Sequence, residues 1–387
     1  MQNNIDNYKQ NQIFENEILE IEIEEEQEIS EPFDATKIKI DARQITIDLV
    51  LNRIKYNEIE LSPDFQRDSS IWGTVAKSRL IESMLIRIPL PAFYIDATDD
   101  NKWIVIDGQQ RLITIKHFVL GLTENYKQDN VLRLSNLEFL TQFNGKSYEE
   151  IPRNYQRRIN ETQITIYLIE KGTPEELKFN IFKRINTGGL PLSPQEIRHA
   201  LNQGKATKFL EKLSESNEFR LATSNSIRDE RMAARETILR FLSFKITDFS
   251  TYASSDLDTF LNNAMKTMNK MSDIELENLE KDFVKAMLAA NEIFGYYAFR
   301  KQFEKNSKKM PFNKSLFESW AVNLSSLNDD QIAILINKKH SLIDSFIKLM
   351  KEDLYFVSAI SQGTGDNNKI RYRFGTIQNL IKYTLQS

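Results

Sequence analysis

The sequence predicts an α+β protein in which a mixed domain is followed by an all-helical domain. Before residue 205, short apolar runs rich in β-branched and aromatic residues lie between turn residues, as at Ala92–Ile95, Trp103–Ile106 and Ile164–Ile169. Runs of this length and composition are typical of strands. From residue 205 onward strand signals are few, and apolar residues recur at helical spacing among charges.

The elements of the mixed domain follow from their local patterns. Thr46–Tyr56 and Thr74–Arg87 are expected to be helices, and the second has a clear apolar stripe that stops before a proline. The runs Ala92–Ile95 and Trp103–Ile106 flank the turn-rich segment Thr98–Asn101. This arrangement predicts a β-hairpin whose second strand leads into the next helix.

We divide the chain into an acidic flexible tail at residues 1–35, a mixed domain at 36–204 and a helical domain at 205–387. The segment from Glu15 to Glu31 holds nine glutamates and no Lys or Arg, so the rest of the chain is net positive although the whole carries −4. Such a run is typical of a solvated tail. The alternative is that it mimics nucleic acid and shields a basic groove.

The composition excludes several classes of protein. At 387 residues and 41% hydrophobic content, the chain is long and apolar enough for a substantial core. It has no apolar run of about 18 residues and its start lacks a signal-peptide pattern, so we expect a cytoplasmic protein with no membrane partner. With no cysteine and three scattered histidines, any metal is expected to be Mg²⁺ held by oxygen ligands.

The clearest chemical signal is the segment from Asp107 to Arg111, where an apolar strand passes directly into an amphipathic helix. Gly108 allows a tight reversal, the next N–H groups belong to the unpaired first turn of a helix, and Arg111 adds a fork of donors. This layout predicts that Gly108, Gln109, Gln110 and Arg111 bind phosphate. The alternative is an Asp-Gly turn in which Arg111 only pairs with a surface carboxylate.

Two further segments carry side chains suited to the same ligand. Phe65, Gln66 and Arg67 could stack on a base and hydrogen-bond its edge or a phosphate, or they could be a core aromatic with an ion-paired arginine. Arg184 and Asn186 lie at a predicted helix end beside two glycines. There Arg184 could contact a phosphate, and Asn186 could offer an oxygen to Mg²⁺ or cap the helix.

Ser193–Glu196 is typical of a capping box, which accounts for Glu196 structurally. His199, beside Ala200 and Leu201, is expected to be packed rather than catalytic.

Basic residues interleaved with aromatics mark candidate contacts with DNA. Arg157 and Arg158 lie in one such cluster and Lys301 in another, and both clusters suit the phosphate backbone. Charged helix faces have the same composition, so that alternative stays open. Lys369–Phe374 alternates in the manner of a strand with basic groups on one side.

Taken in order, these segments resemble the N-terminal domain of GmrSD-type restriction enzymes. The segments that carry the resemblance are Pro63–Arg67, Trp72, Ile106–Leu112, Phe182–Asn186 and Pro191–Arg198. The likeness covers about residues 40–205. The Asp-Gly-Gln-Gln-Arg run is highly specific when the other segments accompany it, although it is weak alone. The family looks like a distant relative of the ParB and sulfiredoxin fold, in which an analogous turn at a helix N-terminus binds the phosphates of a nucleotide.

The resemblance implies a nucleotide-binding, Mg²⁺-dependent NTP-hydrolysing switch of restriction or phage defence. It implies that Gln109, Gln110 and Arg111 hold the phosphates, that Phe65, Gln66 and Arg67 approach the nucleotide, and that Asn186 assists the metal. Asp107, Gln110 and Arg111 are the candidate catalytic residues, with Asp107 as a second metal ligand. DNA, a partner protein or a second copy are further partners that the sequence leaves open.

One departure from the longer members of the family concerns the second half. Those members carry an HNH nuclease domain, which needs paired histidines, whereas residues 205–387 contain only His340. We therefore expect a short member without that nuclease. Two other functions stay open: a metal-dependent nuclease with Asp64, Asp107 and Glu196 as ligands, and a non-catalytic DNA-binding adaptor.

Overall fold

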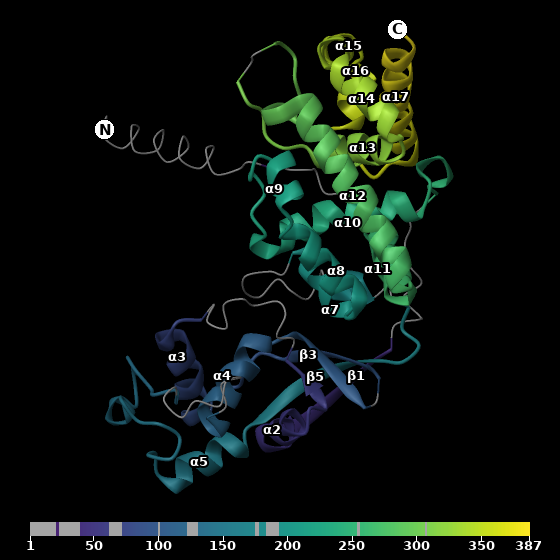
Figure 1. The fold of residues 1–387 in the computed structure, drawn as a ribbon. Helices are drawn as coiled ribbons and strands as arrows, with labels where there is room; N and C mark the ends of the chain where they lie inside the picture. Colours follow the sequence, from purple (N-terminus) through teal and green to yellow (C-terminus); the bar gives the residue numbers. More distant parts are fainter. Residues whose placement is uncertain are drawn as a thin grey trace, which may run out of the picture. The chain divides into compact units, whose positions relative to one another are not determined.

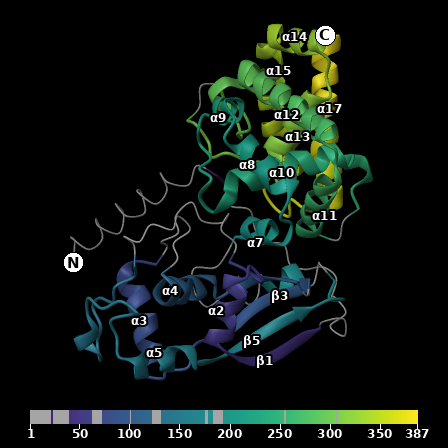
Figure 2. The same ribbon diagram turned by 60° about the horizontal axis from the view of Figure 1, so that its bottom comes forward.

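The structure is a computed structural model of the full chain. The residues that it describes are 21–22, 39–61, 72–99, 101–121, 131–174, 178–182, 193–253, 256–305 and 308–387. They form two compact units, of which one spans Phe33–Leu201 and the other combines Asn202–Ser387 with Met1–Pro32. In Figures 1 and 2 the first unit contains the sheet, and the second is helical and continues to the yellow C-terminus.

The first unit is built on a five-stranded mixed sheet with the order β1-β5-β3-β4-β2. Its strands are β1 (Ile40–Thr46), β2 (Ile59–Glu60), β3 (Phe93–Asp99), β4 (Lys102–Asp107) and β5 (Gln163–Glu170). The pairs β1/β5 and β3/β4 are antiparallel, whereas β3/β5 and β2/β4 are parallel. The predicted hairpin is therefore β3 with β4.

Side chains alternate along β3, so the sheet packs on both faces. Phe93, Ile95 and Ala97 join the main core of the unit, whereas Tyr94 packs against a smaller apolar cluster. The helices whose apolar side chains join the main core are α2 (Ile47–Lys55), α3 (Thr74–Leu85), α4 (Gln109–Leu120) and α5 (Arg153–Asn160). Helix α7 (Pro194–Leu201) contributes Ile197 to the smaller cluster.

Apart from isolated β-bridges at Ile21, Arg300 and Phe312, the regular secondary structure described in the second unit is helical. Its α-helices are α8 (Lys205–Ser214), α9 (Asn217–Ala222), α10 (Ala233–Ile246), α11 (Leu257–Lys270), α12 (Asp273–Phe294), α13 (Lys314–Ser325), α14 (Asp329–Asn337), α15 (Lys339–Glu352), α16 (Leu354–Ala359) and α17 (Asn367–Gln386). They share one large core rich in phenylalanine. No described helix combines the length and the apolar composition needed to cross a membrane. The α+β class expected from the sequence is confirmed.

The strand-like alternation of Lys369–Phe374 was misleading, because this segment lies inside α17. Asp366 caps the helix by accepting hydrogen bonds from the N–H groups of Asn368 and Lys369. The buried residues Ile370, Phe374, Ile377 and Ile381 then recur at helical spacing. Six residues of alternation are too few to outweigh this longer helical period.

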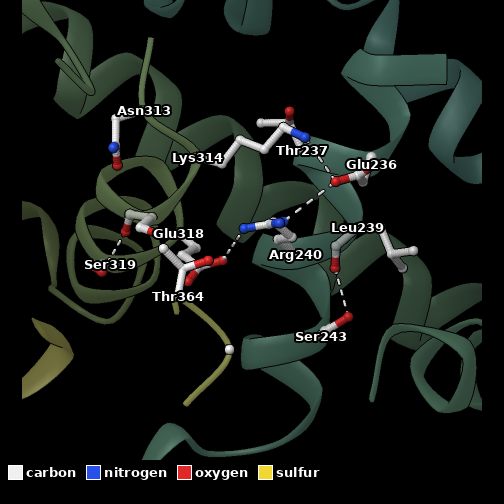
Figure 3. Close-up of polar contacts among 12 residues, drawn as sticks. Glu236, Thr237, Leu239, Arg240, Ser243, Asn313, Lys314, Glu318, Ser319 and Thr364 are labelled. Carbon is white, nitrogen blue, oxygen red and sulfur yellow. Dashed lines mark hydrogen bonds and ion pairs between the residues drawn. The ribbon is translucent and has the colours of Figure 1, made fainter. Parts of the chain in front are cut away.

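Several charged side chains are buried in the helical core (Figure 3). Glu318 of α13 and Arg373 of α17 are fully buried and form an ion pair, and the Arg240 guanidinium of α10 lies 3.7 Å from the Glu318 carboxylate. Figure 3 shows Arg240 between Glu318 and Glu236, and Glu236 pairs with Lys314 at 2.8 Å. Each of these charged side chains therefore lies near one of opposite charge, which offsets the cost of removing the charges from water.

Candidate functional site

The segment that joins β4 to α4 is a single residue, Gly108. Gly108 is the N-cap of α4 with φ at +94°, a left-handed conformation that residues with a β-carbon rarely adopt. A β-carbon here would lie 2.3 Å from Cδ1 of Phe93. Both the backbone conformation and the packing therefore require glycine, and the strand passes into the helix without a loop.

Arg111 lies in the first turn of α4 with 11% of its side chain exposed. Its Nη2 is 2.9 Å from Oδ2 of Asp107 and 3.1 Å from the carbonyl oxygen of Ala92, and its Nη1 donates to the carbonyl of Pro91. The guanidinium also lies 4.4 Å from the ring centroid of Phe93. Burial lowers the pKa of Arg111, and Asp107 opposes this effect. The guanidinium of Arg111 is therefore largely buried and ties the turn to the segment before β3.

Asp107 is the end of β4 and has 34% of its side chain exposed. Oδ2 accepts from Arg111, whereas Oδ1 has no hydrogen-bond partner in the described part of the chain. Tyr94 of β3 pairs with Asp107 in the sheet register and stacks on Tyr167 with ring centroids 4.9 Å apart. Burial raises the pKa of Tyr94, and Tyr167 and Asp107 add to the increase. The phenol is therefore neutral at physiological pH beside a carboxylate that keeps one oxygen available.

Sequence reasoning did not single out Tyr94 or Tyr167. The signal that could have found Tyr94 is the hairpin register, because the residue opposite Asp107 on β3 has to lie near it. Tyr167 requires knowledge that β5 pairs with β3, which no local pattern provides.

Gln110 carries the most unusual feature of the turn. Its Nε2 and Oε1 are both buried, and neither has a hydrogen-bond partner among the described residues. The N-cap of α4 is Gly108, which has no side chain that could cap the helix. A buried amide without a hydrogen-bond partner is rare in native proteins, and water or a ligand can supply the partner.

Residues 47–203 match the family model of the GmrSD restriction endonuclease N-terminal domain. This part of the chain is a GmrSD-type domain. The match includes the Gly108 turn and confirms the resemblance noted in the sequence. A comparison of the chain with curated proteins gives no match. The matched family is that of a restriction endonuclease domain, and the match covers 157 of the 387 residues.

Several predicted site residues of the GmrSD-type domain lie outside the described residues. They are Asp64, Phe65, Gln66, Arg67, Arg184 and Asn186. Of the predicted phosphate and metal ligands, the structure therefore places Asp107, Gly108, Gln109, Gln110 and Arg111, which it brings together at one turn.

Glu196 of the GmrSD-type domain serves the start of α7. The N–H of Ser193 donates to Oε2 of Glu196 at 2.5 Å, and the N–H of Glu196 donates to Oγ of Ser193 at 3.2 Å. The predicted capping box is confirmed, and His199 on the same helix is buried as expected. The described residues contain no group of three His, Asp or Glu side chains that could hold a metal ion.

The three predicted DNA contacts differ in their surroundings. Arg157 has 69% of its side chain exposed and lies 3.6 Å from Glu161. Arg158 donates to the carbonyl of Leu85 at 2.6 Å, and Lys301 of the helical unit has only 13% of its side chain exposed. Arg157 can therefore reach a phosphate backbone as it stands, whereas Arg158 and Lys301 are engaged within the fold.

Proposed function

We propose that the GmrSD-type domain binds the phosphates of a nucleoside triphosphate at the start of α4 and hydrolyses it with Mg²⁺. The observation that carries the proposal is the unpartnered amide of Gln110 in the first turn of a helix that follows a glycine turn. A helix N-terminus attracts anions through its unpaired N–H groups and its dipole.

The energetics of Gln110 favour a ligand. A buried polar group without a hydrogen bond costs about 1–3 kcal/mol, and a ligand that supplies the partner recovers this cost. A phosphate oxygen can accept from Nε2, and water or a nucleotide hydroxyl can donate to Oε1. The amide of Gln110 is therefore already in place before a ligand arrives.

Arg111 supports this site by holding its shape. Because its guanidinium contacts Asp107 and the carbonyls of Pro91 and Ala92, it fixes the turn that presents Gln110. Its positive charge also lies within the first turn, where it adds to the attraction for anions. We therefore assign Arg111 a positioning role in addition to its electrostatic one.

Asp107 fits the role of a metal ligand. Its Oδ1 is without a partner among the described residues, and Mg²⁺ needs only one or two carboxylates besides substrate phosphates and water. The ion would neutralise charge on the transferred phosphoryl group. Asn186 stays the predicted second ligand. We expect Asp107→Asn to lower turnover more than binding, that is, to reduce kcat for the preferred nucleotide while the Kd from calorimetry changes less.

Calorimetry of the full chain with ATP, GTP, CTP and UTP, each with and without Mg²⁺, tests the proposal. Gln110→Met keeps the size of the side chain but removes its hydrogen bonds, and we expect it to weaken binding at least about tenfold. Without nucleotide the same variant should melt at an equal or higher temperature, since the unpaired amide is gone. Lys116→Met on the same helix is the control and should bind as the wild type does. Equal affinity of Gln110→Met and wild type would refute the site.

A second candidate function, DNA contact, draws on the exposed Arg157 and on the restriction-type family. Contact through Arg157 would make DNA affinity fall with salt, and Arg157→Ala would reduce the salt slope by about one. An unchanged slope would argue against this face. The nuclease alternative has less support, because Glu196 is used in a capping box.

A further inference from the structure

Two residues of the acidic N-terminal segment, Ile21 and Glu22, lie against the helical unit as an added strand. Ile21 forms a parallel β-bridge with Phe312, and the N–H of Glu22 donates to the carbonyl of Phe312 at 2.8 Å. On its other side Phe312 forms an antiparallel bridge with Arg300. The backbone of Phe312 is therefore flanked by a partner on each side, in the manner of strand addition.

Side chains reinforce this backbone pairing. The Glu22 carboxylate contacts the ammonium of Lys301 through Oε1, and its Oε2 accepts from Nδ2 of Asn313 at 2.8 Å. Ile21 packs against the large core of the helical unit. The helical unit therefore contacts both the apolar side chain of Ile21 and the acidic side chain of Glu22.

The groups that receive Glu22 are held in place by the helical unit itself. Asn313 caps α13 by accepting from the N–H of Leu316 at 2.7 Å and donates Nδ2 to the carbonyl of Ile360 at 2.7 Å. Lys301 also donates to Oγ of Ser361 at 2.8 Å. Because these contacts do not involve Glu22, the receiving groups remain arranged when the segment leaves.

We propose that Lys301, Phe312 and Asn313 form a docking slot for an extended peptide in which an apolar residue precedes a carboxylate, and that the chain's own Ile21-Glu22 occupies it. The sequence around them, Leu19-Glu20-Ile21-Glu22-Ile23-Glu24, alternates apolar and acidic residues with the period of a strand. The slot attaches the N-terminal segment to the helical unit and covers the Lys301 ammonium. This inference is independent of the nucleotide site, because all of its residues lie in the other unit.

Amine labelling of the full chain followed by mass spectrometry tests the slot. Lys305 has 63% of its side chain exposed and serves as the internal reference for Lys301. We expect slow labelling of Lys301 in the wild type and labelling several-fold faster in Glu22→Gln. Glu28→Gln removes the same charge from the same segment and should leave Lys301 protected. Labelling of Lys301 as fast as Lys305 in the wild type, or equal effects of the two variants, would overturn the proposal.

A charge exchange provides the second test. In Glu22→Lys the new lysine should label rapidly, because it would be repelled by Lys301 and leave the slot. When Glu22→Lys is combined with Lys301→Glu, the new lysine regains a partner of opposite charge and should be protected from labelling. Rapid labelling of the new lysine in the double variant, with the fold intact by circular dichroism, contradicts a specific slot. Protection of wild-type Lys301 that disappears on dilution contradicts occupancy by the same chain and indicates a second copy.

Discussion

The carboxylate of Asp107 holds the guanidinium of Arg111 at 2.9 Å, one helical turn further along the chain. Because Arg111 also binds the carbonyls of Pro91 and Ala92, this pair fastens the end of β4 and the start of α4 to the segment before β3. Two residues that the sequence indicates as separate contributors to catalysis therefore act as one structural unit.

Arg111→Ala should lower stability as well as nucleotide binding. Hydrogen bonds to charged groups contribute about 1.5–3 kcal/mol each, and the variant leaves Asp107 and two carbonyls without their donor. We expect a loss of about 2 kcal/mol in urea unfolding. Asp107→Asn combined with Arg111→Ala should cost less than the sum of the single changes. Additive losses would show that the two side chains act independently.

Gly108→Ala should be far more harmful than alanine at a comparable glycine. Gly145 also has positive φ, at +80°, but a β-carbon there would meet nothing within 4 Å. Gly145→Ala should therefore cost only about 1–2 kcal/mol for its left-handed conformation. Gly108→Ala must in addition displace Phe93, and we expect a larger fall in melting temperature and loss of nucleotide binding. Similar melting temperatures for the two variants would refute this reading of the turn.

Glu318→Ala should destabilise the helical unit strongly. The change leaves the buried cations Arg240 and Arg373 without their shared carboxylate, and removal of one partner of a buried ion pair costs about 3–5 kcal/mol. Glu352→Ala is the matched control, because its pair with Lys348 is highly exposed and should contribute at most about 1 kcal/mol. Denaturant unfolding followed by tryptophan fluorescence reports both, and equal midpoints would contradict the buried network.

Glu150 should make stability depend on pH in the acidic range. The backbone N–H and hydroxyl of Ser147, and then Arg133, lower the pKa of its carboxyl group in the folded state. A carboxyl group whose folded pKa is lowered adds stability above its unfolded pKa, and this is lost as the pH falls through the folded pKa. Glu150→Gln should therefore lower the melting temperature at neutral pH, and the difference should vanish in strong acid. The exposed neighbour Glu149→Gln should show no such difference.

The elements that depend on local patterns could be predicted from the amino-acid order alone. The β3–β4 hairpin, α4 with its glycine turn, the capping box at Ser193 and the helical second unit all follow from short-range periodicity and turn chemistry. The family resemblance also depends on residues that are close along the chain and is confirmed for residues 47–203.

The contacts of the polar side chains could not be predicted in this way, because they depend on how distant elements pack together. Arg111 meets carbonyls 19 and 20 residues away, and Glu22 meets Lys301 at a separation of 279 residues. The same holds for Lys369–Phe374, where the buried Arg373 pairs with Glu318 inside a helix rather than lining the exposed face of a strand. Periodicity tells which face of an element is apolar, but the partner of a charged group depends on which elements pack together, and that is a property of the whole fold.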